Sequence, residues 1–187
     1  MYRKVLAVVM MVAILLAIVP LAQAITFGQP DGSNHPNVGA MIVLEPDGEL
    51  YLYCSGTLIA PDVFLTASHC TIAAAAYGAA PDDVFVTFDP VWDPDSSTLH
   101  PGTYDINPNY GHDMHDLHDV AVIILDEPVT DIVPATLPAA GLLTDMKKDH
   151  ELKGQGFVTV GYGTLRDNKR GGPHALGDYG ERYYADQ

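Results

Sequence analysis

The 187-residue sequence contains few basic residues, few cysteines and little sequence typical of helices. Nine Lys and Arg stand against 24 Asp and Glu, which gives a formal net charge of -15 at pH 7. Because so acidic a chain repels the phosphate backbone, nucleic acid is not expected as a partner. The two cysteines do not form a Cys-x-x-Cys pair, so this common zinc motif is absent. The composition fits an exported protein.

The longest apolar run lies at the amino terminus. Two basic residues precede an unbroken apolar run over 5–19, and a small-x-small pattern that signal peptidase cleaves ends at Ala24. Pro20 interrupts the run before it reaches the roughly 20 apolar residues of a spanning helix. The pattern predicts a signal peptide over 1–24 and a mature chain beginning at Ile25. We therefore expect a secreted, extracellular protein with no membrane association after cleavage.

Cys54 and Cys70 are the two cysteines of the chain. In an oxidising compartment, an even number of cysteines favours a disulfide over free thiols. Closing a loop of about 15 residues would stabilise the fold by roughly 3 kcal/mol in the chain-entropy model. We expect these two residues to be joined.

Short segments rich in β-branched and aromatic residues alternate with turns that contain Pro, Gly and Asp. This texture predicts an all-β barrel or sandwich. One alanine-rich segment, 70–80, is the only helix candidate after the signal peptide, and the Pro-rich segment 127–138 resembles a linker between two units. The predicted strands lie at 39–44, 50–60, 63–68, 84–88, 120–125 and 156–162.

A histidine directly followed by a cysteine closes the segment CSGTLIAPDVFLTASHC, 54–70. A lone histidine is more often structural than catalytic. This segment, however, resembles the region around the catalytic histidine of the trypsin and chymotrypsin family of serine endopeptidases, in which a Cys-Gly-Gly strand leads to Leu-Thr-Ala-Ala-His-Cys. Ser55 and Ser68 replace one Gly and one Ala of that pattern. The resemblance implies a trypsin-like double β-barrel in which His69 is the general base.

The same family carries its catalytic aspartate just before an apolar strand, in a pattern like Asn-Asp-Ile-Ala-Leu. The segment HDVAVIIL, 118–125, resembles this pattern and places Asp119 at the aspartate. NPNY, 107–110, resembles the His-Pro-x-Tyr element at a similar distance upstream. The resemblance implies that Asp119 accepts a hydrogen bond from His69, fixes its tautomer and stabilises the imidazolium.

Two segments could instead bind metal ions. In GHDMHDLHD, 111–119, three histidines recur every third residue, but Asp and His are poor helix formers, and in a strand this spacing sends them to alternate faces. The acidic segment 89–97 lacks EF-hand spacing. We expect a solvated loop in both places and no metal site. The residues concerned are His112, His115 and His118 in the first segment, and Asp89, Asp93 and Asp95 in the second.

Other landmarks of the family follow in order along the chain. Ile25-Thr26-Phe27-Gly28 stands where these enzymes have a new amino terminus such as Ile-Val-Gly-Gly, although Ile25 could also be merely the first residue of a strand. VTVGYGTL, 158–165, resembles the Ala-Gly-Trp-Gly strand early in the second barrel. The resemblance implies a complete first barrel over 25–126, a linker over 127–138 and the start of a second barrel over 139–187.

The sequence lacks the family's nucleophile, because no serine follows Val120. The family supplies this serine in a Gly-Asp-Ser-Gly-Gly-Pro turn, and RGGPHA, 170–175, matches only the end of that motif. The prediction is the amino-terminal part of a secreted trypsin-like serine endopeptidase. As a fragment it would be inactive alone; the enzyme would act on proteins or peptides without a cofactor. The alternatives are a non-catalytic pseudoprotease that binds partners, and a metal-binding β protein.

Overall fold

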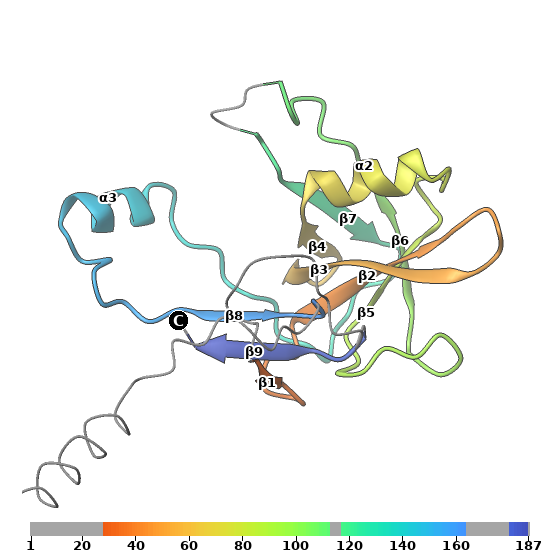
Figure 1. Cartoon of the computed structure of the whole chain (residues 1–187), viewed down its shortest axis with the longest axis horizontal. Helices are drawn as coiled ribbons and strands as arrows, with labels where there is room; N and C mark the ends of the chain where they lie inside the picture. The colour runs from red at the N-terminus through yellow and green to blue at the C-terminus, as the bar shows by residue number, and fades with distance from the viewer. Residues whose placement is uncertain (1–27, 113–116, 164–179, 187) are drawn as a thin grey trace, which may run out of the picture.

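The computed structural model describes residues 28–112, 117–163 and 180–186, and these residues are mostly β (Figure 1). The predicted signal peptide over 1–24, the predicted mature terminus Ile25, His115 and the segment 170–175 lie outside these ranges. The helices and strands, in chain order, are β1 (Gln29–Pro30), β2 (Val38–Leu44), β3 (Leu50–Ala60), β4 (Val63–Thr66), α2 (Ser68–Ala76), β5 (Val84–Thr87), β6 (His100–Tyr104), β7 (Ala121–Leu125), α3 (Leu142–Lys148), β8 (Val158–Gly161) and β9 (Tyr183–Asp186).

Six of these strands form a closed antiparallel barrel in the order β2-β3-β4-β7-β6-β5. The pairing of β2 with β5, which runs from Ala40↔Thr87 to Val43↔Val84, closes it. A register shift between Met41 and Ile42 interrupts the β2–β3 pairing. Closure leaves none of these six strands with an unpaired edge in the sheet, and it matches the barrel expected from the sequence.

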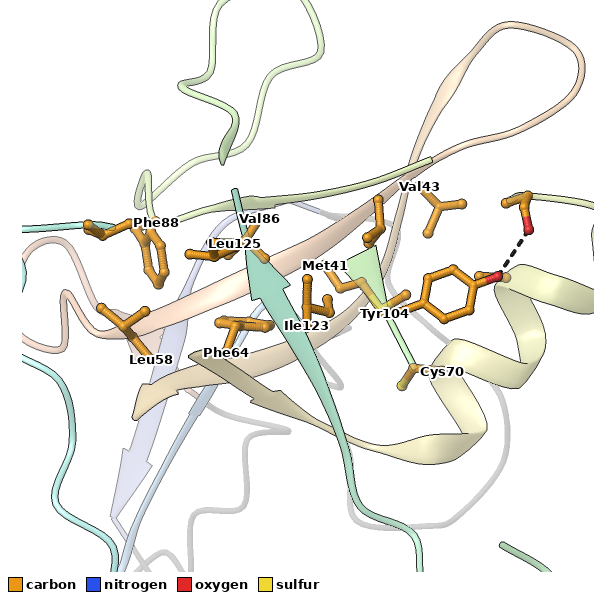
Figure 2. Close-up of a cluster of buried hydrophobic side chains, with 14 residues drawn as sticks. Met41, Val43, Leu58, Phe64, Cys70, Val86, Phe88, Tyr104, Ile123 and Leu125 are labelled. Carbon is orange, nitrogen blue, oxygen red and sulfur yellow. Dashed lines mark hydrogen bonds between the residues drawn. The ribbon is translucent and has the colours of Figure 1, made fainter. Parts of the chain in front are cut away.

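The apolar side chains of the strands fill the barrel interior (Figure 2). Strand β2 is buried along most of its length because it has a core on each face. Met41 and Val43 face the barrel interior with Phe64 and Ile123, whereas Ala40 and Ile42 belong to a second cluster with Tyr162. The unbroken apolar sequence of β2 follows from this double burial. The Tyr104 hydroxyl, also buried, donates to the Ala79 carbonyl at 3.0 Å.

Strands β1, β9 and β8 form a separate three-stranded sheet beside the barrel (Figure 1). The short strand β1 precedes the barrel in sequence but pairs with β9, Gln29↔Tyr184 and Pro30↔Tyr183. Segments near both ends of the described chain therefore contribute strands to the second sheet. A closed barrel and a second sheet are consistent with the predicted trypsin-like double-barrel class.

Between the barrel and α3, the segment 127–138 contains no helix or strand. It is nevertheless held against the barrel, because the Val129 amide donates to the Pro61 carbonyl and the Ala135 amide donates to the Leu58 carbonyl, each at 2.8 Å. Val129 itself is buried. None of the helices in the described part of the chain has the length and apolar composition of a membrane span.

The structure adds four elements to the sequence-based prediction, and the shortest of them is the two-residue strand β1. Strand β6 has the sequence HPGTY. Pro and Gly are uncommon in strands, so this segment was not predicted as one, yet it pairs with both β5 and β7. Strand β9 was not predicted because its surroundings are polar, although its Tyr183 and Ala185 are buried. Within the described residues, α3 is a second helix besides α2, where only 70–80 was predicted. It has no buried residue, so it lacks the apolar face that reveals most helices.

Candidate active site

His69 and Asp119 meet at the start of α2, although 50 residues separate them in sequence. The His69 ring nitrogen Nδ1 lies 2.8 Å from Asp119 Oδ2, and the His69 backbone amide donates to Asp119 Oδ1 at 2.9 Å. Both carboxylate oxygens are therefore engaged by one residue. When Nδ1 carries the proton of the neutral ring, Nε2 is the acceptor nitrogen. The His69 side chain is 57% exposed, which leaves the ring accessible to a substrate.

The disulfide between Cys54 and Cys70 fixes the position of His69. Helix α2 begins directly after β4, so that Ser68 and Cys70 are buried on either side of the exposed His69. The structure contains the predicted bond from Cys70 to Cys54 on β3, with the two Cα atoms 6.3 Å apart. The first turn of the helix is thus covalently attached to the barrel wall.

The hydrogen bonds from His69 also affect the charge of Asp119. Partial burial raises the pKa of the Asp119 carboxyl, but the bonds from the His69 side chain and backbone lower it more, so that the pKa is below its ordinary value. Asp119 is consequently ionised at neutral pH. An ionised carboxylate at Nδ1 stabilises a positive charge on the imidazole.

The histidines of the 111–119 segment are not gathered into a metal site within the part of the chain that the structure describes. There, the group of potential ligands close enough to share an ion is Cys54, His69 and Cys70. Two members of that group are joined in the disulfide, so they offer no thiolate to a metal. His112 and His118 are not part of the group, and His115 lies outside the described residues.

The acidic segment uses carboxylates to hold its own backbone. Asp93 Oδ1 accepts a hydrogen bond from the Asp95 amide at 2.9 Å, and Asp89 Oδ2 accepts one from the Thr98 amide at 2.7 Å. The bond between Asp93 and Asp95, two residues apart, is typical of turns, and the bond between Asp89 and Thr98 joins the two ends of the loop. They give these carboxylates a structural role in the loop.

Ser55, which stands where the family pattern has a glycine, connects the barrel to the second sheet. Its Oγ accepts a hydrogen bond from the Tyr162 amide at 2.8 Å. The approach is close, because a Cβ at the neighbouring Gly161 would lie 2.8 Å from the same oxygen. Since Ser55 follows Cys54, this contact joins β8 to β3 next to the disulfide that holds His69.

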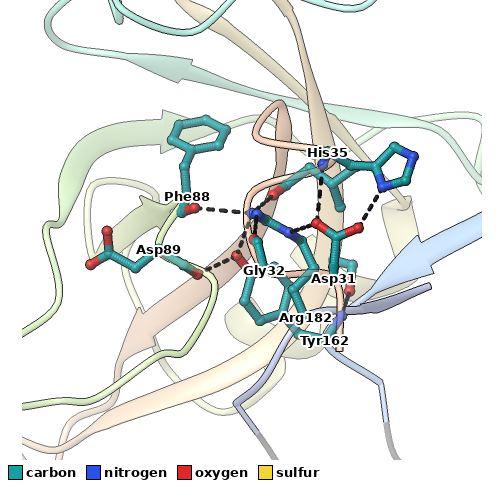
Figure 3. Close-up of polar contacts among 9 residues, drawn as sticks. Asp31, Gly32, His35, Phe88, Asp89, Tyr162 and Arg182 are labelled. Carbon is teal, nitrogen blue, oxygen red and sulfur yellow. Dashed lines mark hydrogen bonds and ion pairs between the residues drawn. The ribbon is translucent and has the colours of Figure 1, made fainter. Parts of the chain in front are cut away.

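The structure also contains a buried cluster around Arg182 that no sequence pattern predicted (Figure 3). Arg182 Nε donates to Asp31 Oδ2 at 2.8 Å, and Asp31 Oδ1 also contacts the His35 ring. Arg182 Nη1 lies 3.2 Å from the Tyr162 hydroxyl. Burial, the largest effect on this phenol, raises the pKa of Tyr162 to about 12. No local motif marks this cluster, because Tyr162 and Arg182 are far from Asp31 and His35 in sequence.

Comparisons with known proteins agree with the fold and the motif. The family model described as Trypsin matches residues 29–177. A solved structure titled "Structure of GrC" aligns with a TM-score of 0.56 and 17% sequence identity, covering 85% of this chain and 62% of that chain. At this identity, the likeness concerns the fold alone, and this chain spans less than two thirds of that structure. No curated protein sequence matched. Because the family model covers more than half of the sequence, the chain belongs to the trypsin family.

Proposed function

We propose that this chain is the amino-terminal part of a secreted trypsin-like serine endopeptidase, with His69 as general base and Asp119 as its orienting carboxylate. The main support for this proposal is the contact of 2.8 Å between His69 Nδ1 and Asp119 Oδ2. A carboxylate on Nδ1 and an accessible Nε2 are what a histidine needs to take a proton from a serine hydroxyl.

In the complete enzyme, His69 Nε2 accepts the proton of the nucleophile as its oxygen attacks a peptide carbonyl. The resulting imidazolium then gives the proton to the leaving amine, and water releases the acyl group by the same steps in reverse order. Asp119 stays ionised throughout and stabilises the imidazolium. The substrates are proteins or peptides, and no cofactor takes part in these steps.

The nucleophile belongs, on this proposal, to a part of the protein that the sequence does not contain. No serine follows Val120. The hydroxyls of the two serines nearest His69 in sequence are engaged with the backbone: Ser55 accepts from the Tyr162 amide, and Ser68 donates to the Val120 carbonyl. The matched solved structure is also longer than this chain, which supports a missing portion.

The disulfide supports the proposed secretion, because such bonds persist in oxidising compartments. The apolar run over 5–19 supports removal of residues 1–24 on export, with Ile25 as the first mature residue. The acidic composition supports protein rather than nucleic acid as the partner. We infer no membrane association after cleavage.

Two experiments test the proposed function. The nucleotide sequence beyond codon 187 is read in all three frames, and a Gly-Asp-Ser-Gly-Gly-like turn is expected there. The 187-residue chain alone should hydrolyse peptides no faster than its His69→Ala variant, because the nucleophile and its oxyanion donors are absent. The extended protein should hydrolyse them, and Asp119→Asn should lower kcat by about 10⁴-fold.

A stop codon followed by unrelated sequence in every frame would contradict the enzyme proposal. The protein would then be a non-catalytic binding protein built on the protease fold. Turnover by the 187-residue chain that is lost in His69→Ala would contradict the proposed source of the nucleophile.

A further inference from the structure

We propose that Ser68 and Asn107 are positioning residues that hold the turn carrying Asp119, so that its carboxylate faces His69. Their importance for catalysis rests on the proposed function. Their contacts with the turn do not depend on that function. The two residues come from different parts of the chain. Ser68 begins α2, next to His69, and Asn107 lies between β6 and β7.

Asp119 occupies the centre of a tight three-residue turn. The Val120 amide donates to the His118 carbonyl at 2.9 Å, which closes the turn around Asp119. His118 has a φ of 50°, in the left-handed region that non-glycine residues seldom adopt. A strained conformation of this kind persists only where surrounding contacts impose it. The geometry of the turn therefore calls for restraints from outside.

The external restraints converge on the two carbonyls that flank Asp119. The Ser68 hydroxyl donates to the Val120 carbonyl at 2.6 Å, with the His118 carbonyl at 3.4 Å. Because a hydroxyl has one proton, the shorter contact is its principal bond. Asn107 Nδ2 contacts the same pair of oxygens, at 2.9 Å to His118 and 3.1 Å to Val120. Its two amide protons allow one bond to each carbonyl.

Both donors are themselves held in place. Ser68 is fully buried at the start of α2, and its own carbonyl accepts a bond from the Thr71 hydroxyl at 3.0 Å. Asn107 Oδ1 accepts a bond from the Asn109 amide at 3.0 Å, which orients the Asn107 amide nitrogen toward the turn. The restraints thus have a defined direction: Ser68 holds mainly the Val120 carbonyl, and Asn107 holds the carbonyls on both sides of Asp119.

The arrangement couples the two halves of the candidate site through adjacent residues. His69 contacts the Asp119 carboxylate directly, and the Ser68 hydroxyl donates to the Val120 carbonyl next to Asp119. Loss of the Ser68 hydroxyl would remove a bond from the turn without adding bulk to the core. We therefore expect the His69–Asp119 contact to loosen while the barrel remains folded.

The test measures the titration of the Asp119 carboxyl by carbon NMR in the full 187-residue chain and in the variants Ser68→Ala, Asn107→Ala and the double variant. Because hydrogen bonds from His69 lower this pKa in the native protein, a loosened contact should shift it toward the ordinary aspartate value. The expected order is a small shift in each single variant and a larger one in the double variant. Asn107 is only half-buried, so its variant provides a reading if Ser68→Ala fails to fold.

Thr66→Val is the matched control. Thr66 is buried two residues before Ser68, and its hydroxyl donates to the Ser55 carbonyl at 3.1 Å and not to a carbonyl of the Asp119 turn. Valine keeps the shape and removes one hydrogen bond, so this control measures the general effect of losing a hydroxyl here. It should lower thermal stability without moving the Asp119 titration.

An unchanged Asp119 titration in Ser68→Ala, Asn107→Ala and the double variant would overturn the proposal, as would an equal shift in Thr66→Val. In the extended protein, Ser68→Ala should reduce kcat at least several-fold and leave KM nearly unchanged, because orientation of the base and not substrate binding is altered. An inactive extended protein in which the variants still shift the Asp119 titration would support the positioning role and reject the proposed function. An active extended protein in which the variants change neither kcat nor the Asp119 titration would support the proposed function and reject the positioning role.

Discussion

Arg182 and Asp31 form an ion pair that is almost completely buried, with Arg182 Nε 2.8 Å from Asp31 Oδ2 across 151 residues of sequence. The Arg182 guanidinium also donates to the carbonyls of Val38, Phe88 and Gly32 (Figure 3). One side chain, directly before β9 of the second sheet, is therefore bonded both to the segment before the barrel and to the barrel itself. This pair connects the two halves of the described fold.

Arg182→Met should destabilise the protein by about 3–5 kcal/mol, because the buried Asp31 carboxylate loses its countercharge. The free energy of unfolding is measured by urea titration. Lys148→Ala is the control, since it breaks an exposed ion pair with Asp145 and should leave the free energy unchanged within error. Adding Asp31→Asn to Arg182→Met should recover part of the loss. Equal effects of the Arg182 and Lys148 variants would show that burial of the first pair has no consequence.

Asp31 should make the fold sensitive to acid. Burial raises the pKa of its carboxyl, but hydrogen bonds from His35 and Arg182 and the charge of Arg182 lower it more, so that the pKa lies below the ordinary 3.8. A carboxyl with a lowered folded-state pKa contributes stability that is complete above the ordinary value and is lost as pH falls through the folded value. The free energy of unfolding should therefore decrease below about pH 4, and less steeply in Asp31→Asn. Parallel pH profiles would refute this contribution.

The Cys54–Cys70 disulfide should be present in protein produced in an oxidising compartment. Mass spectrometry of a non-reduced digest should show the cross-linked peptide. Replacing both cysteines by alanine should cost roughly 3 kcal/mol, because the unfolded chain gains the entropy of an open loop. Two alkylatable thiols in native material would contradict the bond.

Zinc should bind weakly, if at all. The disulfide occupies both cysteines, and the described histidines of 111–119 are not gathered around a common point. Calorimetry with purified protein should give no site of sub-micromolar affinity. A tight stoichiometric site that disappears in His115→Ala would restore the metal-binding alternative.

The sequence alone was sufficient for features that depend on local pattern. Alternating and continuous apolar runs marked the barrel strands β2, β3, β4, β5 and β7, because each run needs only its own side chains to show which faces are buried. The His-Cys motif and the aspartate before an apolar strand singled out His69 and Asp119. The structure places these two side chains in contact, while their catalytic roles stay predictions.

Only the tertiary structure decided the features that depend on distant partners. Arg182 is an ordinary basic residue in a polar segment until the fold brings Asp31 against it, and Ser68 is a small replacement until β7 places the Val120 carbonyl 2.6 Å from its hydroxyl. Strand β6 is a strand because β5 and β7 flank it, not because HPGTY favours one. Local propensity amounts to a fraction of a kcal/mol per residue, so burial and hydrogen bonding across the fold override it at such positions.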